Sequence, residues 1–395
     1  MIRVEMLATG DEILHGQIID TNAAWLSELL FEEGLPMTSR MTVGDNLPEL
    51  IAALSQRSQI ADVLIVNGGL GPTSDDLSSQ AAAIAAGVKL KLEPEWLAKM
   101  ETRFAMRGRI MAPCNRKQAE IPEGAEILDN PAGTACGFAM QLNCCWLYFT
   151  PGVPAEFKTM VQQQVIPHIN AHFLLPQPLL CLRLTTFGCS ESLLAAKLND
   201  ITLPQGVVTG YRAAMPVIEL KLTGPEQKRA DMQAIWQQIR EIVGDHLIFE
   251  GKETLAQQLA RCLRERGLSL SVSERYTGGL LNWHLALATA PLVTGEVQPP
   301  PSETLDELAV SGKTADITLI VGDCQADGSI AFALRTPGNI FAQRLQLNLQ
   351  NYSLSIRQQT VAIAAMNMLR RWLNGKSVTG SFGWVEALET REFTL

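Results

Sequence analysis

The sequence predicts an α/β protein that opens with a doubly wound sheet of buried parallel strands. Short, wholly apolar runs alternate with segments of helical periodicity in the N-terminal part of the chain. Two of these runs end directly in glycine-rich turns that also carry carboxylates, one at Gly10 and one at Gly68. At 395 residues the chain exceeds the size at which one hydrophobic core stops growing, so we expect two or three domains.

The elements of the N-terminal domain follow from these patterns in chain order. We expect strands over residues 2–7, 63–66, 136–140 and 145–149, and helices over residues 22–31, around 51–54 and over 78–86. Continuous apolar runs of this kind are typical of strands that are buried on both faces of a parallel sheet. The carboxyl ends of such strands converge on one crevice, which is where doubly wound proteins bind their ligands.

Two smaller domains are expected after a proline-rich break near residue 176. The first is α+β, with strands over 180–186 and 217–223 and helices over 192–198 and 227–243. The second has helices over 253–267 and 358–373, strands over 268–272, 317–321 and 329–335, and a loop over 291–301, where four prolines interrupt any periodicity. We place the three domains at residues 1–172, 179–250 and 251–395.

Composition restricts the partners of this protein. The net charge is −9 and there is no basic run, which argues against a nucleic-acid surface. No segment reaches the roughly 20 apolar residues that a membrane span needs, and the first residues lack the pattern of a signal peptide. We therefore expect a cytoplasmic protein whose anionic ligands are held by local features.

Cysteine usage points to a reducing compartment. The eight cysteines form no Cys-x-x-Cys pair and no regular framework, so buried free thiols are expected. The adjacent pair Cys144 and Cys145 lies in an apolar, strand-like run, which favours a structural role over a redox role.

The loop at residues 67–76 has the composition of a phosphate-binding loop. Gly68, Gly69 and Gly71 allow backbone N–H groups to approach phosphate oxygens, and the helix that follows contributes its positive N-terminal end. Thr73 offers a further donor.

Adjacent carboxylates in the same loop suggest that a metal accompanies the phosphate. Asp75 and Asp76 would repel a bare phosphate, whereas a divalent cation binds carboxylate and phosphate oxygens together. Asp11 and Glu12, at the end of the first strand, would reach the same crevice and add metal or ribose contacts. The alternative is that these residues only cap helices, which requires neither a second carboxylate nor three glycines.

Three other segments are weaker candidates. Residues 115–118 include Lys117 and could grip an anion, and the turns at 130–134 and 151–154 could form walls of the crevice. His168 and His172 have the spacing of a metal pair, but we expect a solvated helix end because the glutamate of a His-Glu-x-x-His site is missing.

The motifs occur in an order that resembles the CinA family over nearly the whole chain. They are Thr9-Gly-Asp-Glu12, Asp20-Thr-Asn22, Gly68-Gly-Leu-Gly-Pro-Thr-Ser-Asp-Asp76, Asn115-Arg-Lys-Gln118, Asn130-Pro-Ala-Gly-Thr134 and Pro151-Gly-Val-Pro154. The resemblance implies a molybdopterin-binding fold for the N-terminal domain, with hydrolysis of ADP-ribose to AMP and ribose 5-phosphate dependent on Mg²⁺, Mn²⁺ or Co²⁺. It also implies a homodimer.

On the leading hypothesis of a metal-dependent hydrolase, we assign roles to the residues of these motifs. Catalysis and metal binding fall to Asp75, Asp76 and Asp11. Substrate binding falls to Gly68, Gly69, Gly71, Thr73, Lys117, Thr9 and Asn130, of which the last two are expected to contact the nucleoside.

The third domain resembles the family's nicotinamide-nucleotide amidohydrolase domain but lacks its nucleophile. Where the family has Glu-Ser-Cys-Thr-Gly-Gly, this chain has Glu274-Arg-Tyr-Thr-Gly-Gly279, so Arg275 stands in the place of the serine. Arginine stays protonated and cannot attack an amide. Thr277, Gly278 and Gly279 are retained, and the family's lysine-bearing stretch has no counterpart. We expect a non-catalytic remnant.

Two alternatives to the hydrolase remain open. The whole chain could be a nucleotide-binding or scaffolding pseudoenzyme, because a protein that has lost one site could have lost another. The N-terminal fold could also handle a pterin phosphate or molybdopterin.

Overall fold

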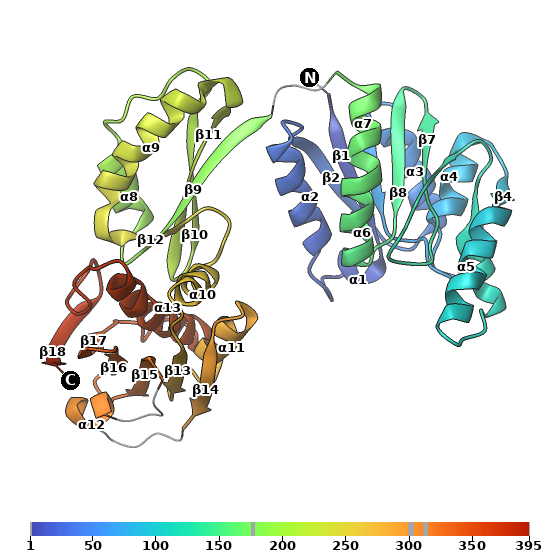
Figure 1. Ribbon diagram of the computed structural model, residues 1–395. Coiled ribbons are helices and arrows are strands. Elements are labelled where there is room, and N and C mark those ends of the chain that lie inside the picture. Colours follow the sequence, from blue (N-terminus) through green and yellow to red (C-terminus); the bar gives the residue numbers. More distant parts are fainter. Residues whose placement is uncertain (1, 175–177, 299–303, 311–314, 395) are drawn as a thin grey trace. The chain divides into compact units, whose positions relative to one another are not determined.

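The computed structural model describes residues 2–174, 178–298, 304–310 and 315–394 (Figure 1). Internal contacts divide the chain into two compact units, Met1–Leu179 and Leu180–Leu395. We call them unit 1 and unit 2 and describe each separately.

Unit 1 is built on a mixed sheet of six strands with the order β2-β1-β3-β8-β7-β6. Four neighbouring strands are parallel, namely β2 (Met37–Val43), β1 (Val4–Thr9), β3 (Val63–Asn67) and β8 (Cys145–Thr150). The strand β7 (Gly137–Leu142) is antiparallel to β8, and β6 (Glu126–Leu128) is antiparallel to β7. The sequence patterns therefore predicted the buried parallel strands correctly, although β2 was not expected.

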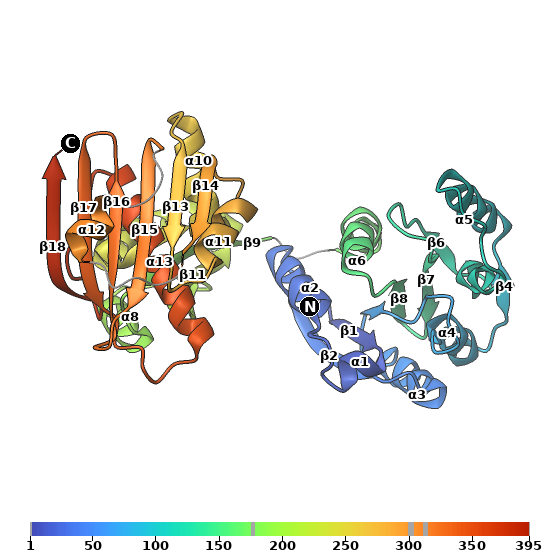
Figure 2. The same ribbon diagram turned by 90° about the horizontal axis from the view of Figure 1, so that it is seen from below.

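Helices cover both faces of this sheet, as a doubly wound fold requires. Figure 2 shows α2 (Thr21–Glu32) and α6 (Pro154–Met160) on one side, and α3 (Leu47–Arg57) and α4 (Ser78–Ala86) on the other. The first side also carries α7 (Ile166–His172), and the second carries α5 (Pro94–Met106). Each face of the sheet has its own apolar core. Successive residues of a strand point alternately into one core and into the other.

Unit 2 contains two lobes, each with its own sheet. The middle lobe has the strand order β10-β11-β9-β12, formed by Val208–Ala214, Val217–Pro225, Leu179–Phe187 and Leu247–Glu250. The helices α8 (Glu191–Leu198) and α9 (Arg229–Val243) cover one face of this sheet and share its core. The expected α+β character is confirmed.

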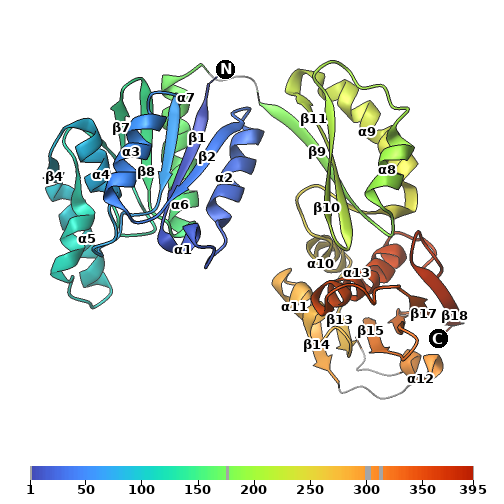
Figure 3. The same cartoon turned by 180° about the vertical axis from the view of Figure 1, so that it is seen from behind.

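The C-terminal lobe has a six-stranded mixed sheet with the order β14-β13-β15-β16-β17-β18. These strands are Leu292–Val297, Leu270–Glu274, Ile317–Cys324, Ser329–Arg335, Asn339–Gln346 and Glu386–Thr394. One face packs against α10 (Leu255–Glu265), α11 (Leu280–Leu287) and α13 (Leu354–Leu373), of which α13 is the long helix in Figure 3. The other face packs against α12 (Leu305–Val310).

The expected loop over residues 291–301 is wrong in its first half. Leu292–Val297 forms β14, which pairs in parallel with β13 at the edge of the sheet. Its side chains alternate between half-buried and exposed, which is the pattern of a strand with one covered face. The prolines do not interrupt this strand, because Pro291 precedes it and the other three come after it. Residues 299–301 lie outside the described residues.

All eight cysteines are free thiols, but they are not all buried. Cys145 is buried in β8, where burial raises the pKa of its thiol to about 12, whereas Cys144 is exposed in the preceding turn. The expectation of uniformly buried thiols is therefore corrected, since Cys114, in the short 3-10 helix Pro113–Ala119, and Cys144, in a turn, are both exposed.

None of the helices in the described part of the chain is long and apolar enough to cross a lipid bilayer.

Candidate functional site

The carboxyl ends of the parallel strands in unit 1 meet at one edge of the sheet. Gly10 follows β1 and donates its N–H to Val43 O of β2 at 3.2 Å, while Gly68 follows β3 and donates to Thr150 O of β8 at 2.9 Å. The turns after β1, β2, β3 and β8 are thus held side by side. We call this edge, with the loops at residues 9–12, 44–46, 67–76 and 150–153, the strand-end site.

Glycine is required where the loop after β3 approaches its neighbours. Gly68 has φ +109°, and a Cβ atom there would lie 2.7 Å from Thr9 O. Gly69 has φ +69°, and its Cβ would lie 2.4 Å from Ser78 Oγ, which itself donates to Gly68 O at 2.8 Å. The loop therefore lies directly against β1 and the first turn of α4, which a larger residue would prevent.

Three successive N–H groups of this loop are available to a ligand. The N–H groups of Gly69, Leu70 and Gly71 have no hydrogen-bond partner among the described residues. The N–H of Gly68, by contrast, is used by Thr150 O and is not available as the sequence had suggested. Successive unpaired N–H groups in a turn can together donate hydrogen bonds to the oxygens of one anion, so this stretch offers a set of donors to an anion.

Asp76 and Lys117 both stabilise the turn around Thr73. Asp76 Oδ2 accepts the Thr73 N–H at 2.9 Å, and Lys117 Nζ donates to Thr73 O at 2.6 Å. Hydrogen bonding from Thr73 lowers the pKa of the exposed Asp75 carboxyl, and the charge of Lys117 adds to this. The structure therefore brings Lys117 to the loop, as expected, although both side chains also hold its backbone.

Asp11 is hydrogen-bonded to Asp45, a residue that the sequence analysis did not single out. The Asp11 N–H donates to Asp45 Oδ2 and the Asp45 N–H donates to Asp11 Oδ1, each at 3.2 Å. Thr9 Oγ1 donates to Asp45 Oδ1, also at 3.2 Å. Asp45 follows Gly44 after β2 just as Asp11 follows Gly10 after β1, and this Gly-Asp repeat at successive strand ends was the signal that could have identified it.

These carboxylates create a local need for positive charge. Burial raises the pKa of Asp45, and the nearby negative charges of Asp11 and Glu12 add to the effect, against hydrogen bonds from Asp11 and Thr9 that lower it. A cation placed beside the Asp11–Asp45 pair would relieve this repulsion.

The strand-end site does not assemble a metal cage from protein ligands alone. In the part of the chain that the structure describes, no three His, Cys, Asp or Glu residues are grouped so as to hold a metal ion. Asp11, Asp75 and Asp76 therefore do not form the three-ligand set that the sequence suggested. The donors still fit a hard divalent cation, because Mg²⁺ in phosphate sites commonly uses one or two carboxylates together with substrate oxygens and water.

Two asparagines connect the loops, and sequence reasoning did not assign them. Asn67 Nδ2 donates to Pro151 O at 2.7 Å, and Asn67 Oδ1 accepts from Asn22 Nδ2 at 3.0 Å. Asn22 Nδ2 also donates to Gly152 O at 2.8 Å. Both side chains are buried, so this network fixes the loops after β3 and β8 and the start of α2 relative to one another.

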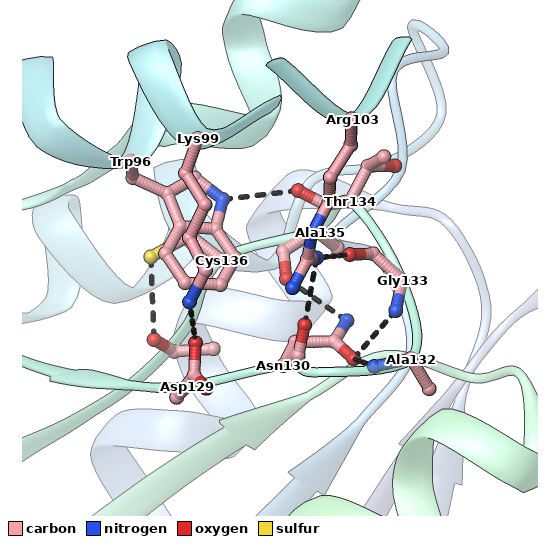
Figure 4. Close-up of polar contacts among 11 residues, drawn as sticks. Trp96, Lys99, Arg103, Asp129, Asn130, Ala132, Gly133, Thr134, Ala135 and Cys136 are labelled. Atoms are coloured by element: carbon pink, nitrogen blue, oxygen red, sulfur yellow. Dashed lines mark hydrogen bonds and ion pairs between the residues drawn. The ribbon is translucent and has the colours of Figure 1, made fainter. Parts of the chain in front are cut away.

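The turn at residues 129–134 is held by one face of α5 (Figure 4). Trp96 Nε1 donates to Thr134 O at 3.0 Å, Arg103 donates to Asn130 O at 2.8 Å and also to Gly133 O, and Lys99 pairs with Asp129. These α5 side chains are spaced three and four residues apart and so lie on one side of the helix.

Asn130 is the centre of this turn and is fully buried. Its Oδ1 accepts the Gly133 N–H at 2.9 Å, and its Nδ2 donates to Ala135 O at 3.1 Å and to Glu156 Oε2 at 2.8 Å. Its side chain is thus used by the protein, so Asn130 shapes the wall of the crevice and the expected nucleoside contact stays a prediction.

In the third domain, a carboxylate of the same domain binds the N–H groups that follow the retained turn at residues 277–279. Glu274, fully buried at the end of β13, accepts the N–H groups of Leu281 at 3.0 Å and Asn282 at 2.8 Å. The N-terminal end of α11 is therefore already neutralised. Arg275 is buried and donates to Gln298 Oε1 at 3.1 Å.

His168 is not a solvated helix end. Its Nδ1 lies 2.9 Å from the hydroxyl of the buried Tyr148, and its Nε2 lies 3.1 Å from Glu126 Oε2. The ring also packs edge-on against Trp146 at 4.6 Å. The prediction was wrong for His168 because β6 and β8 place polar partners there, whereas His172 is exposed.

Comparison with known proteins identifies relatives of this chain. Residues 5–171 match the family described as "Probable molybdopterin binding domain". The chain is 53% identical, over 99% of both chains, to the CinA-like protein of Escherichia coli strain 55989 and to the NMN amidohydrolase-like protein YfaY of strain K12.

Two solved structures are similar to part of the chain. One is CinA of unknown function from Thermoplasma acidophilum, with 28% identity, coverage of 42% of this chain and 96% of that one, and a TM-score of 0.39. The other is the molybdopterin biosynthesis enzyme MoaB from Thermus thermophilus, with 18% identity, coverage of 44% and 93%, and a TM-score of 0.30. On its full-length identity to the curated relatives, the chain belongs to the family of CinA-like proteins.

Proposed function

We propose that unit 1 hydrolyses the pyrophosphate of ADP-ribose or a related nucleotide, yielding AMP and ribose 5-phosphate. The observation that carries the proposal is the row of unpaired N–H groups at Gly69, Leu70 and Gly71, next to the carboxylates of Asp75 and Asp76. Membership of the CinA-like family supports it but leaves the reaction open.

In this proposal, one set of groups in the strand-end site binds the phosphates and another set holds the metal. The N–H groups of Gly69 to Gly71, with the Lys117 ammonium group, would bind phosphate oxygens and stabilise the charge that develops on them. One or two carboxylates, from Asp75 and Asp76 or from the Asp11–Asp45 pair, would hold a divalent ion together with substrate oxygens and water. Such an ion, when bound, polarises a phosphoryl group and lowers the pKa of water.

The direct test is to incubate the full chain with ADP-ribose and Mg²⁺, Mn²⁺ or Co²⁺ and to follow AMP by chromatography. Turnover with at least one metal is expected. Absence of turnover with all three would refute the proposal, and tight ADP-ribose binding without hydrolysis would then support a pseudoenzyme.

Asp76→Asn tests the role of the carboxylate. We expect activity to fall about a hundredfold or more, which is the usual scale for removing one catalytic electrostatic group. The amide oxygen still accepts the Thr73 N–H, so the melting temperature should change little. Asp62→Asn is the matched control, because it removes the same charge just before β3 begins, at the opposite edge of the sheet. Equal losses in both variants would contradict a specific role for Asp76.

The amidase reaction suggested by the name of one relative is not what the C-terminal lobe supports. Arg275 stands at the nucleophile's position, where it is buried and donates to Gln298 Oε1. We therefore expect no ammonia release from nicotinamide mononucleotide. The molybdopterin-binding fold leaves a pterin phosphate as a second ligand class, which competition against ADP-ribose would reveal.

A further inference from the structure

A cavity of about 450 Å³ lies between the two lobes of unit 2. Val217 and Phe249 of the middle lobe form one wall. The helices α10, α11 and α13 of the C-terminal lobe form the others, and none of residues 274–279 lines it. Its volume falls within the range of about 300–1,000 Å³ that is typical of small-molecule sites.

The lining determines the polarity of the occupant. Most of the side chains are apolar, including Leu255, Ala288, Ile363 and Met366, and no Asp, Glu, Lys or Arg is among them. A charged ligand would lose part of its hydration here without gaining a counter-ion from the lining. The cavity therefore favours a neutral and largely apolar molecule.

One polar side chain in the lining has no hydrogen-bond partner among the described residues. The imidazole nitrogens of His284 make no hydrogen bond to any described residue, although the side chain is half-buried. Burial lowers the pKa of His284, so the ring is neutral near pH 7 and offers one donor and one acceptor. By contrast, Thr254 and Gln257 bond to each other in the capping box of α10.

We propose that this cavity is a binding site for a neutral small molecule with an apolar ring system and one polar group that hydrogen-bonds to His284. Because both lobes contribute walls, a bound molecule would link the middle lobe to the C-terminal lobe. The proposal concerns unit 2 alone and does not depend on hydrolysis by unit 1.

The test uses N-phenyl-1-naphthylamine, a neutral aromatic probe with one N–H group, and the full-length protein. Its fluorescence should rise and saturate at one probe per chain. Ala288→Trp, which fills the cavity from the residue just after α11, should weaken binding about tenfold or more, whereas Ala286→Trp, at an exposed position in the last turn of α11, should not.

Two further variants keep the test informative if Ala288→Trp unfolds the lobe. Leu287 lines the cavity yet is 64% exposed, so Leu287→Arg should fold and still weaken binding by placing a charge in the cavity. Leu354→Arg, at an exposed leucine outside the lining, is its control. His284→Phe should weaken binding about fivefold through loss of one hydrogen bond. No saturable binding, or binding that none of the cavity variants weakens, would overturn the proposal.

Discussion

Asn130 is a buried polar side chain whose hydrogen bonds hold the turn at residues 129–134. Asn130→Ala would leave the Gly133 N–H and Ala135 O without their partners inside the protein. We expect unit 1 to lose about 2–4 kcal/mol of stability, the scale for breaking a buried hydrogen-bond network. Urea unfolding measures this loss. Asn170→Ala, at an exposed position of α7, should change stability by no more than about 0.5 kcal/mol.

His284 links the stability of unit 2 to pH. Burial lowers its pKa below the ordinary value of 6.5, so the unfolded chain binds a proton more readily than the folded one. Stability is therefore fully present above pH 6.5 and falls as the pH drops through that value. Urea unfolding of unit 2 between pH 5 and pH 8 should show this decline, and His284→Gln should make the profile flatter. An unchanged profile in the variant would assign the decline to other groups.

At the scale of elements, the strand-end site depends on how closely neighbouring turns approach. A Cβ atom at Gly44 would lie 2.4 Å from Asp11 Oδ1, although the backbone of Gly44 is not in the left-handed region. Gly44→Ala should therefore displace the Asp11 carboxylate without straining its own turn. We expect metal-dependent AMP formation to fall about tenfold while the melting temperature stays nearly constant.

Gly338→Ala is the control for this substitution. Gly338 also avoids the left-handed region, and its added Cβ would meet nothing within 4 Å. Activity equal to wild type in Gly44→Ala would show that Asp11 does not take part in the reaction.

Elements were predicted well where burial makes a strand uniformly apolar, and poorly where it does not. The runs at β3 and β8 are buried on both faces and were found from the sequence. The edge strand β2 is half exposed and reads as polar, and β14 has prolines on either side of it, so neither was expected. An edge strand is defined by its backbone pairing, which leaves little trace in local hydropathy.

At the scale of the whole molecule, two compact units should unfold separately. Calorimetry of the full chain is expected to show two transitions, because each unit has its own cores. Asn130→Ala should lower only the transition of unit 1. Saturation with N-phenyl-1-naphthylamine should raise only that of unit 2, since a ligand stabilises the unit that binds it. One transition that responds to both changes would show that the units unfold together.

The sequence alone determined the properties that depend on residue type and local order. The three glycines before Asp75 and Asp76 predicted a loop at a strand end, and Arg275 excluded an amide-attacking nucleophile at its position. Both conclusions follow from what a backbone or a side chain can do wherever it lies.

Only the tertiary structure decided which distant groups meet. Asn22 joins Asn67 across 45 positions, Asp11 joins Asp45 across 34, and Lys117 reaches Thr73 across 44. The cavity beside His284 likewise exists only because two lobes contribute its walls. Such contacts are set by strand order and by the packing of separate elements, and local hydropathy and propensity carry no information about either.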